Sequence, residues 1–233
     1  MIEKLPVFIS ITFGLITLIT LWLFYNLLKK STVEKIANPV CITLIIWLVL
    51  QAVLTLKGFY NTNTTVLPPK IMLFGILPAI FVIILLFATP KGRRFIDALP
   101  LKDITYLNTI RLPIEIVLFY LFLNKAVPQL MTFEGRNFDI ISGITAPFIA
   151  YFGFTKQMLS RKLISGWNFV CLILLINIVA NALLSAPLAF QQFAFNQPNI
   201  AILNFPFSWL PTFLVPIVLF GHLVSIRQLL IAR

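Results

Sequence analysis

Residues 37–57 read ANPVCITLIIWLVLQAVLTLK and carry a single charge, on the final lysine. A helix needs about 20 predominantly apolar residues to cross the hydrocarbon core of a bilayer. This stretch has that length and that composition. It therefore predicts a membrane-spanning helix.

The rest of the chain follows the same pattern. Hydrophobic residues make up 60% of the sequence and charged residues 11%, and the mean hydropathy is +0.99. So few charges cannot cover a water-exposed surface. We expect an all-α membrane protein, a single transmembrane domain over residues 1–233 with seven transmembrane helices. The expected spans are 5–28, 37–57, 69–89, 105–125, 138–156, 167–189 and 204–229.

The positions of the basic residues predict the orientation, because cytoplasmic loops are enriched in lysine and arginine. With seven spans, alternate loops place 12 basic residues on one side, from Lys29 to Arg233, and five on the other, among them Lys4. We therefore expect the N-terminus outside and the C-terminus in the cytoplasm. Short loops with abundant Ile and Phe favour the inner (plasma) membrane of a bacterium.

The net charge of +11 sits in short clusters between apolar runs. It never forms a basic face with interleaved aromatic side chains, so no nucleic-acid partner is expected. Anionic headgroups of membrane lipids are the expected partners of these clusters.

An internal duplication is predicted by comparing the sequence with itself. At a shift of 130 residues, residues 38–55 and 168–185 are identical at 8 of 18 positions, and the two cysteines, Cys41 and Cys171, coincide. At a shift of 133, residues 77–87 match residues 210–220 at 6 of 11 positions. The matching helices run in the same direction, which allows a 3+1+3 parallel repeat with halves 1–100 and 131–233.

Corresponding helices of the two halves also carry matching prolines, Pro78 and Pro211. With seven helices, an outside N-terminus and a 3+1+3 plan, the chain resembles the SWEET and PQ-loop transporters in its helix arrangement. The pair Pro128-Gln129 lies in the loop after the fourth helix, where the motif of that group does not belong. The resemblance of the helix plan implies transport of a small solute.

Two charges interrupt the fourth apolar run. Arg111 and Glu115 are four residues apart and therefore share a helix face. Charges inside a membrane are costly and mark functional candidates. Two interpretations stay open: a structural ion pair, or a Glu115 that binds substrate or protons and is held by Arg111.

The densest polar cluster precedes the fifth span and contains Glu134, Arg136, Asn137 and Asp139. Asn137 or Asp139 could cap the following helix, since short acceptors satisfy its free N–H groups. The alternative is an external ligand or cation site. Ser142 would continue such a polar path below Asp139.

Amides and one histidine complete the candidates. Asn177 and Asn181 lie four apart in the sixth span, and the predicted repeat aligns Gln51 with Asn181. His222, the single histidine, lies in the seventh span. These side chains could pack between helices through hydrogen bonds, or they could bind substrate or relay protons.

A small-solute transporter is the function these features favour, with a polar site between the two three-helix halves. Two alternatives stay open: a receptor or subunit of a larger membrane complex, and a membrane enzyme acting on a lipid or quinone. A homo-oligomer or a partner subunit is compatible with each of them. No catalytic residues, cofactor or metal site are predicted, because one histidine and two separated cysteines supply no ligand set.

Overall fold

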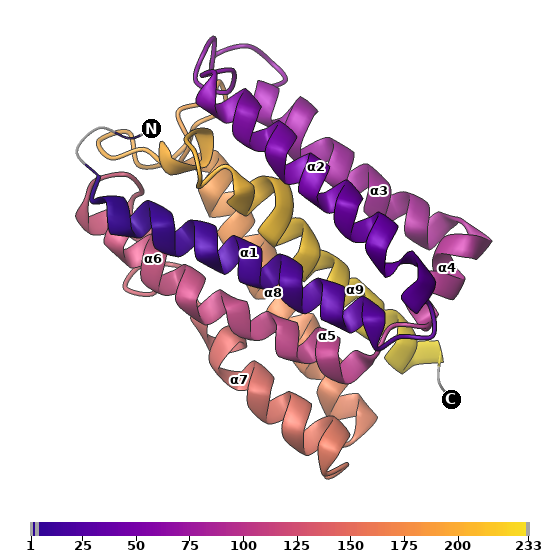
Figure 1. The fold of residues 1–233 in the computed structure, drawn as a ribbon. Coiled ribbons are helices and arrows are strands. Elements are labelled where there is room, and N and C mark those ends of the chain that lie inside the picture. Colours follow the sequence, from indigo (N-terminus) through magenta and orange to yellow (C-terminus); the bar gives the residue numbers. More distant parts are fainter. Residues whose placement is uncertain (1, 3–4, 232–233) are drawn as a thin grey trace.

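The computed structural model describes residues 2 and 5–231, and every regular element there is a helix (Figure 1). Lys4 and Arg233, which enter the charge count, lie outside the described residues. The α-helices are α1 Val7–Lys29, α2 Ala37–Leu56, α3 Leu77–Ala88, α4 Pro90–Asp97, α5 Leu101–Leu107, α6 Arg111–Leu123, α7 Ile140–Ala150, α8 Arg161–Leu184 and α9 Val215–Ile231. Short 3-10 helices are η1 Glu34–Ile36, η3 Asn108–Ile110, η4 Gln129–Met131 and η6 Ala201–Leu203, and π-helices are η2 Met72–Ile76, η5 Tyr151–Thr155 and η7 Leu210–Leu214.

Five helical rods are long and apolar enough to cross a membrane. They are Val7–Lys29, Glu34–Leu56, Leu101–Leu123, Arg161–Leu184 and Leu210–Ile231. These rods coincide with the first, second, fourth, sixth and seventh predicted spans. Their outward faces are apolar, and such large exposed apolar surfaces suit contact with lipid. The prediction of an all-helical membrane protein is confirmed at this level.

The other two predicted spans are helical but differ from simple rods. Met72–Ala88 bends by 92° into α4, which would make a sixth span if the pair is one broken span. The bend lies at Thr89, whose hydroxyl accepts from the backbone N–H of Gly92 at 3.1 Å, with Pro90 in the first turn. Both are helix-start signals. Ile140–Thr155 is a shorter apolar helix, and Pro147 lies inside its α7 part without ending it.

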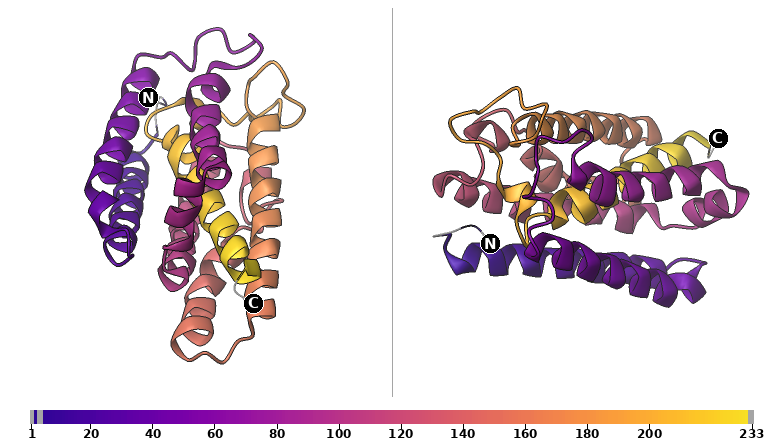
Figure 2. Two further views of the ribbon diagram at one scale, coloured as in Figure 1. Left: turned by 90° about the vertical axis from the view of Figure 1, so that its right-hand side faces the viewer. Right: turned by 90° about the horizontal axis from the view of Figure 1, so that it is seen from above.

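The helices form an elongated bundle. In Figure 1, α2 and α3 lie along one side of it and α7 along the other, and Figure 2 shows α1 and α2 on one face and α8 on the opposite face. The main apolar core joins side chains of α1, α5–α6 and α9, such as Phe13, Leu121 and Val224. The start of α1 and the end of α9 lie at opposite ends of the bundle (Figure 1).

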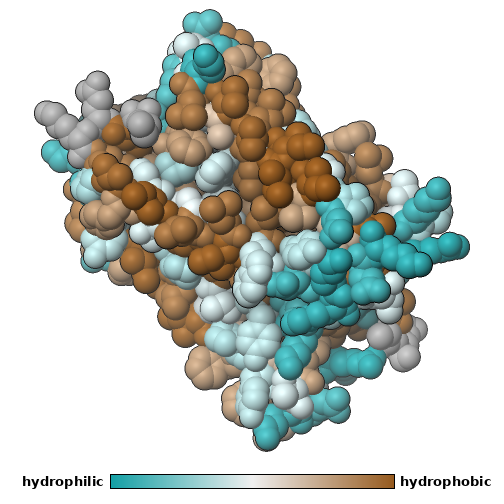
Figure 3. Space-filling model, viewed as in Figure 1, coloured by the Kyte–Doolittle hydropathy of each residue, from teal (hydrophilic) through white to brown (hydrophobic). Residues whose placement is uncertain are grey.

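One end of the bundle carries most of the basic side chains. It is formed by the end of α1, by α4, by the starts of α5 and α8 and by the end of α9, and we call it the basic end. Figure 3 shows hydrophilic side chains gathered there, beside the hydrophobic surface of the rods. The described lysines and arginines at this end are Lys29, Lys30, Lys35, Lys91, Arg93, Arg94, Lys102, Lys156, Arg161, Lys162 and Arg227.

Candidate functional site

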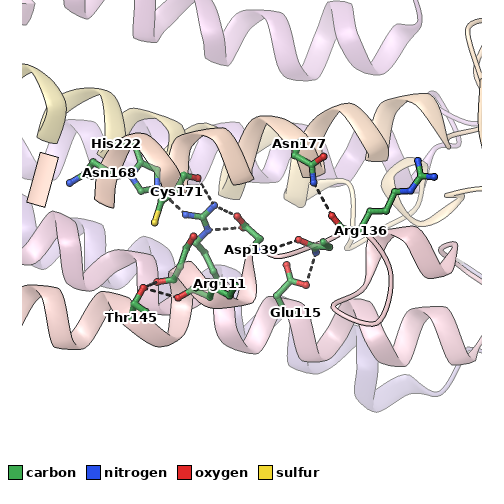
Figure 4. Close-up of polar contacts among 12 residues, drawn as sticks. Arg111, Glu115, Arg136, Asp139, Thr145, Asn168, Cys171, Asn177 and His222 are labelled. Atoms are coloured by element: carbon green, nitrogen blue, oxygen red, sulfur yellow. Dashed lines mark hydrogen bonds and ion pairs between the residues drawn. The ribbon is translucent and has the colours of Figure 1, made fainter. Parts of the chain in front are cut away.

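Arg111 is buried at the centre of the bundle, at the first residue of α6 and halfway along the continuous rod Leu101–Leu123. Its side chain is 2% exposed. Its Nε donates to Asp139 Oδ2 at 2.6 Å and its Nη2 donates to Asp139 Oδ1 (Figure 4). A buried guanidinium must be paired and hydrogen-bonded to offset its desolvation, and the two-pronged contact with Asp139 does this.

His222 of α9 lies on the other side of the Arg111 guanidinium. Its Nε2 is 2.9 Å from Arg111 Nη1, and its Nδ1 is 2.9 Å from Asn168 Oδ1 of α8. Because arginine has no acceptor, Nε2 of His222 must accept. The proton of the neutral ring is then on Nδ1 and is donated to Asn168. Both ring nitrogens of His222 are therefore hydrogen-bonded.

Glu115 follows Arg111 by one helical turn but has a different partner. Its carboxylate Oε2 accepts from Asn137 Nδ2 at 2.6 Å, and Asn137 Oδ1 accepts from the backbone N–H of Asp139 at 3.0 Å. Within residues 2 and 5–231, Glu115 forms no ion pair. The first of the two interpretations, a structural ion pair between Arg111 and Glu115, is not what the structure has: Arg111 pairs with Asp139, and Glu115 accepts from a neutral amide.

The loop before α7 brings these partners into the bundle. Asn137 and Asp139 are buried, whereas Glu134 and Arg136 of the same cluster are exposed. Asp139 occupies the N-cap position of α7, but no side chain caps that helix. The capping interpretation is wrong because the Asp139 carboxylate is bound by Arg111 and Asn137 accepts from the Asp139 backbone. Irregular backbone at this depth is tolerated in membrane proteins where it is buried in protein or lines a cavity.

The candidate amides lie in two other places. Asn177 Nδ2 donates to the backbone carbonyl of Arg136 at 2.8 Å, and Asn181 Nδ2 donates to Asn177 Oδ1 at 3.3 Å. They thereby attach α8 to the loop that carries Asn137 and Asp139. Gln51 lies apart, on the face of α2 toward η2, where it donates to the carbonyl of Phe74 and accepts from Tyr60.

A cavity of about 70 Å³ adjoins the network. Arg111, Glu115 and Asp139 are its charged wall, and the remainder is formed by apolar side chains, most of them from α6, α8, η7 and α9. A volume of this size has room for a few water molecules. His222, Gln51, Asn177 and Asn181 are not among its lining residues.

Residues 68–230 match the model of a protein family described as Domain of unknown function (DUF8737). The match covers more than half of the chain. The protein belongs to the DUF8737 family. No curated protein and no solved structure matches the chain. All six side chains of the network, which are Arg111, Glu115, Asn137, Asp139, Asn168 and His222, lie inside the segment that defines DUF8737, whereas Gln51 lies before it.

Sequence reasoning missed Asn168 of this DUF8737 protein as a site residue. It is 1% exposed and fixes the His222 ring, while its own Nδ2 donates to the carbonyl of Ile164 at 2.9 Å. The signal was present, because Asn168 is an amide in an apolar run just as Asn177 is. Its place opposite His222 depends on how α8 and α9 pack, which spacing along one helix does not encode.

Two buried oxygens extend the polar region toward the basic end. Asn108 lies three residues before Arg111, and Ser225 lies three residues after His222. Asn108 Oδ1 and Ser225 Oγ are buried and have no hydrogen-bond partner within the described part of the chain. Buried unpaired polar atoms are rare in native proteins, so each calls for an explanation. The network also contains no group of three or more His, Cys, Asp or Glu side chains placed to hold a metal, among the residues that the structure describes.

Proposed function

We propose that this DUF8737 protein is a proton-coupled membrane transporter of a small solute, with Glu115 as the coupling residue. The observation that carries the proposal is the environment of Glu115. This carboxylate is 2% exposed, lines the cavity and accepts from an amide, with no cation bound to it in the described residues. A carboxylate in such a place can exchange a proton for a donor group of a solute, because no cation is paired with it directly.

Arg111 has a different role in this proposal. Its guanidinium is bound by Asp139, by His222 and by the carbonyl of Cys171 at 3.3 Å, so its charge is already balanced by the Asp139 carboxylate. Arg111 therefore holds the loop before α7 in place and leaves Glu115 as the group that is free to titrate.

The irregular helices support a transport function. The chain enters α7 from a buried loop, and π-helices η2 and η7 meet beside the cavity wall. Discontinuous helices with polar sites near the midplane are typical of alternating-access transporters. π-helical turns are frequent at functional sites.

The path from the cavity toward the basic end is the second supporting feature. Asn108 Oδ1 and Ser225 Oγ are available acceptors one helical turn beyond Arg111 and His222. We propose that water or a proton passes these oxygens when the bundle opens toward the basic end. In this arrangement the polar residues form a line from Glu115 to the side that the charge pattern predicts to be cytoplasmic.

The topology that accompanies this proposal is the predicted one. Seven crossings result if Met72–Ala88 and Ile140–Thr155 each cross the membrane together with the five long rods. The start of α1 and the end of α9 at opposite ends of the bundle agree with an odd number of crossings (Figure 1). The 3+1+3 repeat and the bacterial inner membrane stay predictions.

Proton movement in proteoliposomes tests the proposal. Vesicles loaded with a pH-sensitive dye receive amino acids, amines or monosaccharides from outside, and the lumenal pH is followed. We expect at least one class to change the lumenal pH in the parent protein. Glu115→Gln should abolish that change, and Glu134→Gln, which neutralises an exposed carboxylate of the loop, should leave it intact. An unchanged signal in Glu115→Gln, or no signal with any class, would overturn the proposal.

A further inference from the structure

A second and much larger hollow lies on the other side of α9. It has a volume of about 810 Å³, within the range of sites for whole small molecules. Its walls come mainly from α2, α3, α4, η7 and α9, with one residue each from α1 and η1, and we call it the α2–α3 groove. The lining is apolar except for a few side chains, namely Thr43, Trp47, Thr89, Lys91 and Thr212.

The contacts that join α2 to the segment leading into α3 lie toward one end of the groove. Toward the end opposite α4, Gln51 Nε2 donates to the Phe74 carbonyl at 3.0 Å, and the rings of Phe59 and Phe74 are 5.3 Å apart. Trp47 Nε1 donates to the carbonyl of Thr212 at 3.0 Å and ties α2 to η7. The two helices otherwise make almost no backbone contact with each other. Toward the basic end they leave a space that their own side chains do not fill.

The mouth of the groove at the basic end is positively charged. Lys91 of α4 lines the groove, and Arg93 and Arg94 follow on the same short helix. None of the three forms an ion pair within the described residues, whereas Asp97 at the far end of α4 is bound by Arg227 at 2.9 Å. The unpaired positive charges therefore gather at the start of α4, where its own dipole is also positive.

We propose that the α2–α3 groove binds one anionic phospholipid of the leaflet at the basic end. Its acyl chains lie between α2, α3 and α9, and its phosphate lies at Lys91. The apolar lining suits hydrocarbon, and the unpaired cations at one mouth select an anionic over a zwitterionic headgroup. A soluble solute would find almost no polar partner along the groove.

This lipid would contact the helix that separates the groove from the candidate site. Thr212, Phe213 and Pro216 line the groove, while Pro211 and Leu214 of the same turns line the cavity. A bound acyl chain thus packs on one face of η7, and the opposite face forms a wall of the cavity beside Glu115. The groove is a place where membrane lipid composition can act on the candidate site.

Native mass spectrometry of the full chain in detergent tests the headgroup part of the proposal. The protein is incubated with equal amounts of palmitoyl-oleoyl phosphatidylglycerol and phosphatidylcholine, and the retained lipids are counted. We expect one retained lipid with a preference for phosphatidylglycerol. Lys91→Gln should lower that preference about fivefold, since one lysine near the headgroup supplies that much. Lys102→Gln removes the same charge at the same end but outside the groove, and it should retain the parent preference.

A second pair of variants tests the acyl-chain part. Ala79 lines the groove, and Ile84 on the same helix is 56% exposed and does not. Ala79→Phe should abolish retention of both lipids, whereas Ile84→Phe should retain them as the parent does. Lys91 is exposed on the surface, so its variant stays informative if Ala79→Phe misfolds. The proposal would be overturned if Lys91→Gln kept the parent's preference for phosphatidylglycerol. It would also be overturned if Lys91→Gln and Lys102→Gln lowered that preference equally.

Discussion

The guanidinium of Arg111 on α6 and the carboxylate of Asp139, directly before α7, form a buried two-pronged ion pair at the centre of the bundle. The pair joins the continuous rod Leu101–Leu123 to α7, which begins beside the middle of that rod. Two desolvated charges are held by one contact, so removing either leaves the other without compensation. The contact therefore helps to hold α7 against the rod, together with the packing of α7 on α5 and α6.

Replacing Arg111 with methionine should destabilise the fold strongly. The Asp139 carboxylate would stay buried without a cation, at a cost of about 3–5 kcal/mol in the free energy of unfolding. The double variant Arg111→Met with Asp139→Leu should recover most of that loss, because it removes the second charge as well. Unfolding midpoints in detergent measure both effects.

The exposed pair Arg227–Asp97 is the matched control for that experiment. It has the same two-pronged geometry, at 2.9 and 3.0 Å, but lies at the surface of the basic end. Arg227→Gln should leave the unfolding midpoint almost unchanged, since exposed ion pairs contribute little. An equal loss in Arg227→Gln and Arg111→Met would contradict the argument from burial.

Asn137→Ala should also destabilise the protein, by a smaller amount. It removes the donor to Glu115 and the acceptor of the Asp139 N–H, and buried polar groups left unpaired cost about 1–3 kcal/mol. Asn124→Ala removes an exposed amide that donates to the carbonyl of Tyr120, and we expect little change. Thermal unfolding of the two variants side by side is the measurement, and similar midpoints would argue against a structural role for Asn137.

Hydropathy was sufficient to find the apolar helical segments and the two charges that interrupt one of them. It could not identify which partner Arg111 takes. Spacing places Glu115 on the same face, but the choice of Asp139 depends on a loop that folds back into the bundle. Irregular backbone has no periodicity, so the sequence does not show that Asp139 is buried inside the bundle.

The bend between α3 and α4 is a different case. Thr89-Pro90 is a helix-start signal of an N-cap threonine followed by proline, and it stands at the end of an apolar run. An analysis of helix-capping residues together with hydropathy would have predicted the break between α3 and α4. By contrast, the pairing of His222 with Asn168 requires the packing of α8 on α9, which one sequence does not supply.

A close approach between two π-helices gives a prediction about packing. A Cβ added at Gly75 of η2 would lie 2.5 Å from Thr212 Cγ2 of η7. Gly75→Ala should therefore cost about 1–3 kcal/mol of stability through overpacking. Thr212→Ser removes the clashing methyl and keeps the hydroxyl that donates to the Ser208 carbonyl, so it should rescue Gly75→Ala. A double variant as unstable as Gly75→Ala alone would place the strain elsewhere.

The loop after α2 should make stability fall at alkaline pH. Burial raises the pKa of Tyr60 to about 12, and its hydroxyl donates to Gln51 Oε1 at 2.5 Å. The folded state therefore prefers the neutral phenol, whereas the unfolded phenol ionises from about pH 10. Stability from this group is complete below pH 10 and is lost as the pH rises to 12. Tyr60→Phe should be less stable at neutral pH, and its free energy of unfolding should fall less between pH 10 and 12. Equal slopes of stability against pH in the parent and the variant would refute the assignment.

Water access to the cavity distinguishes a transport site from a closed structural core. Ala182 of α8 lines the cavity, whereas Ile176 on the same helix is 58% exposed on the apolar surface. In a background without Cys41 and Cys171, Ala182→Cys should react with a charged, membrane-impermeant thiol reagent, because the reagent follows water. Ile176→Cys should stay unreactive, since lipid covers that face. Glu115→Gln should alter the pH dependence of the Ala182→Cys reaction, because the neighbouring carboxylate sets the local charge. If Ala182→Cys is as inert as Ile176→Cys in membranes at every pH, the cavity is closed to water and the network around Arg111 serves to hold the fold.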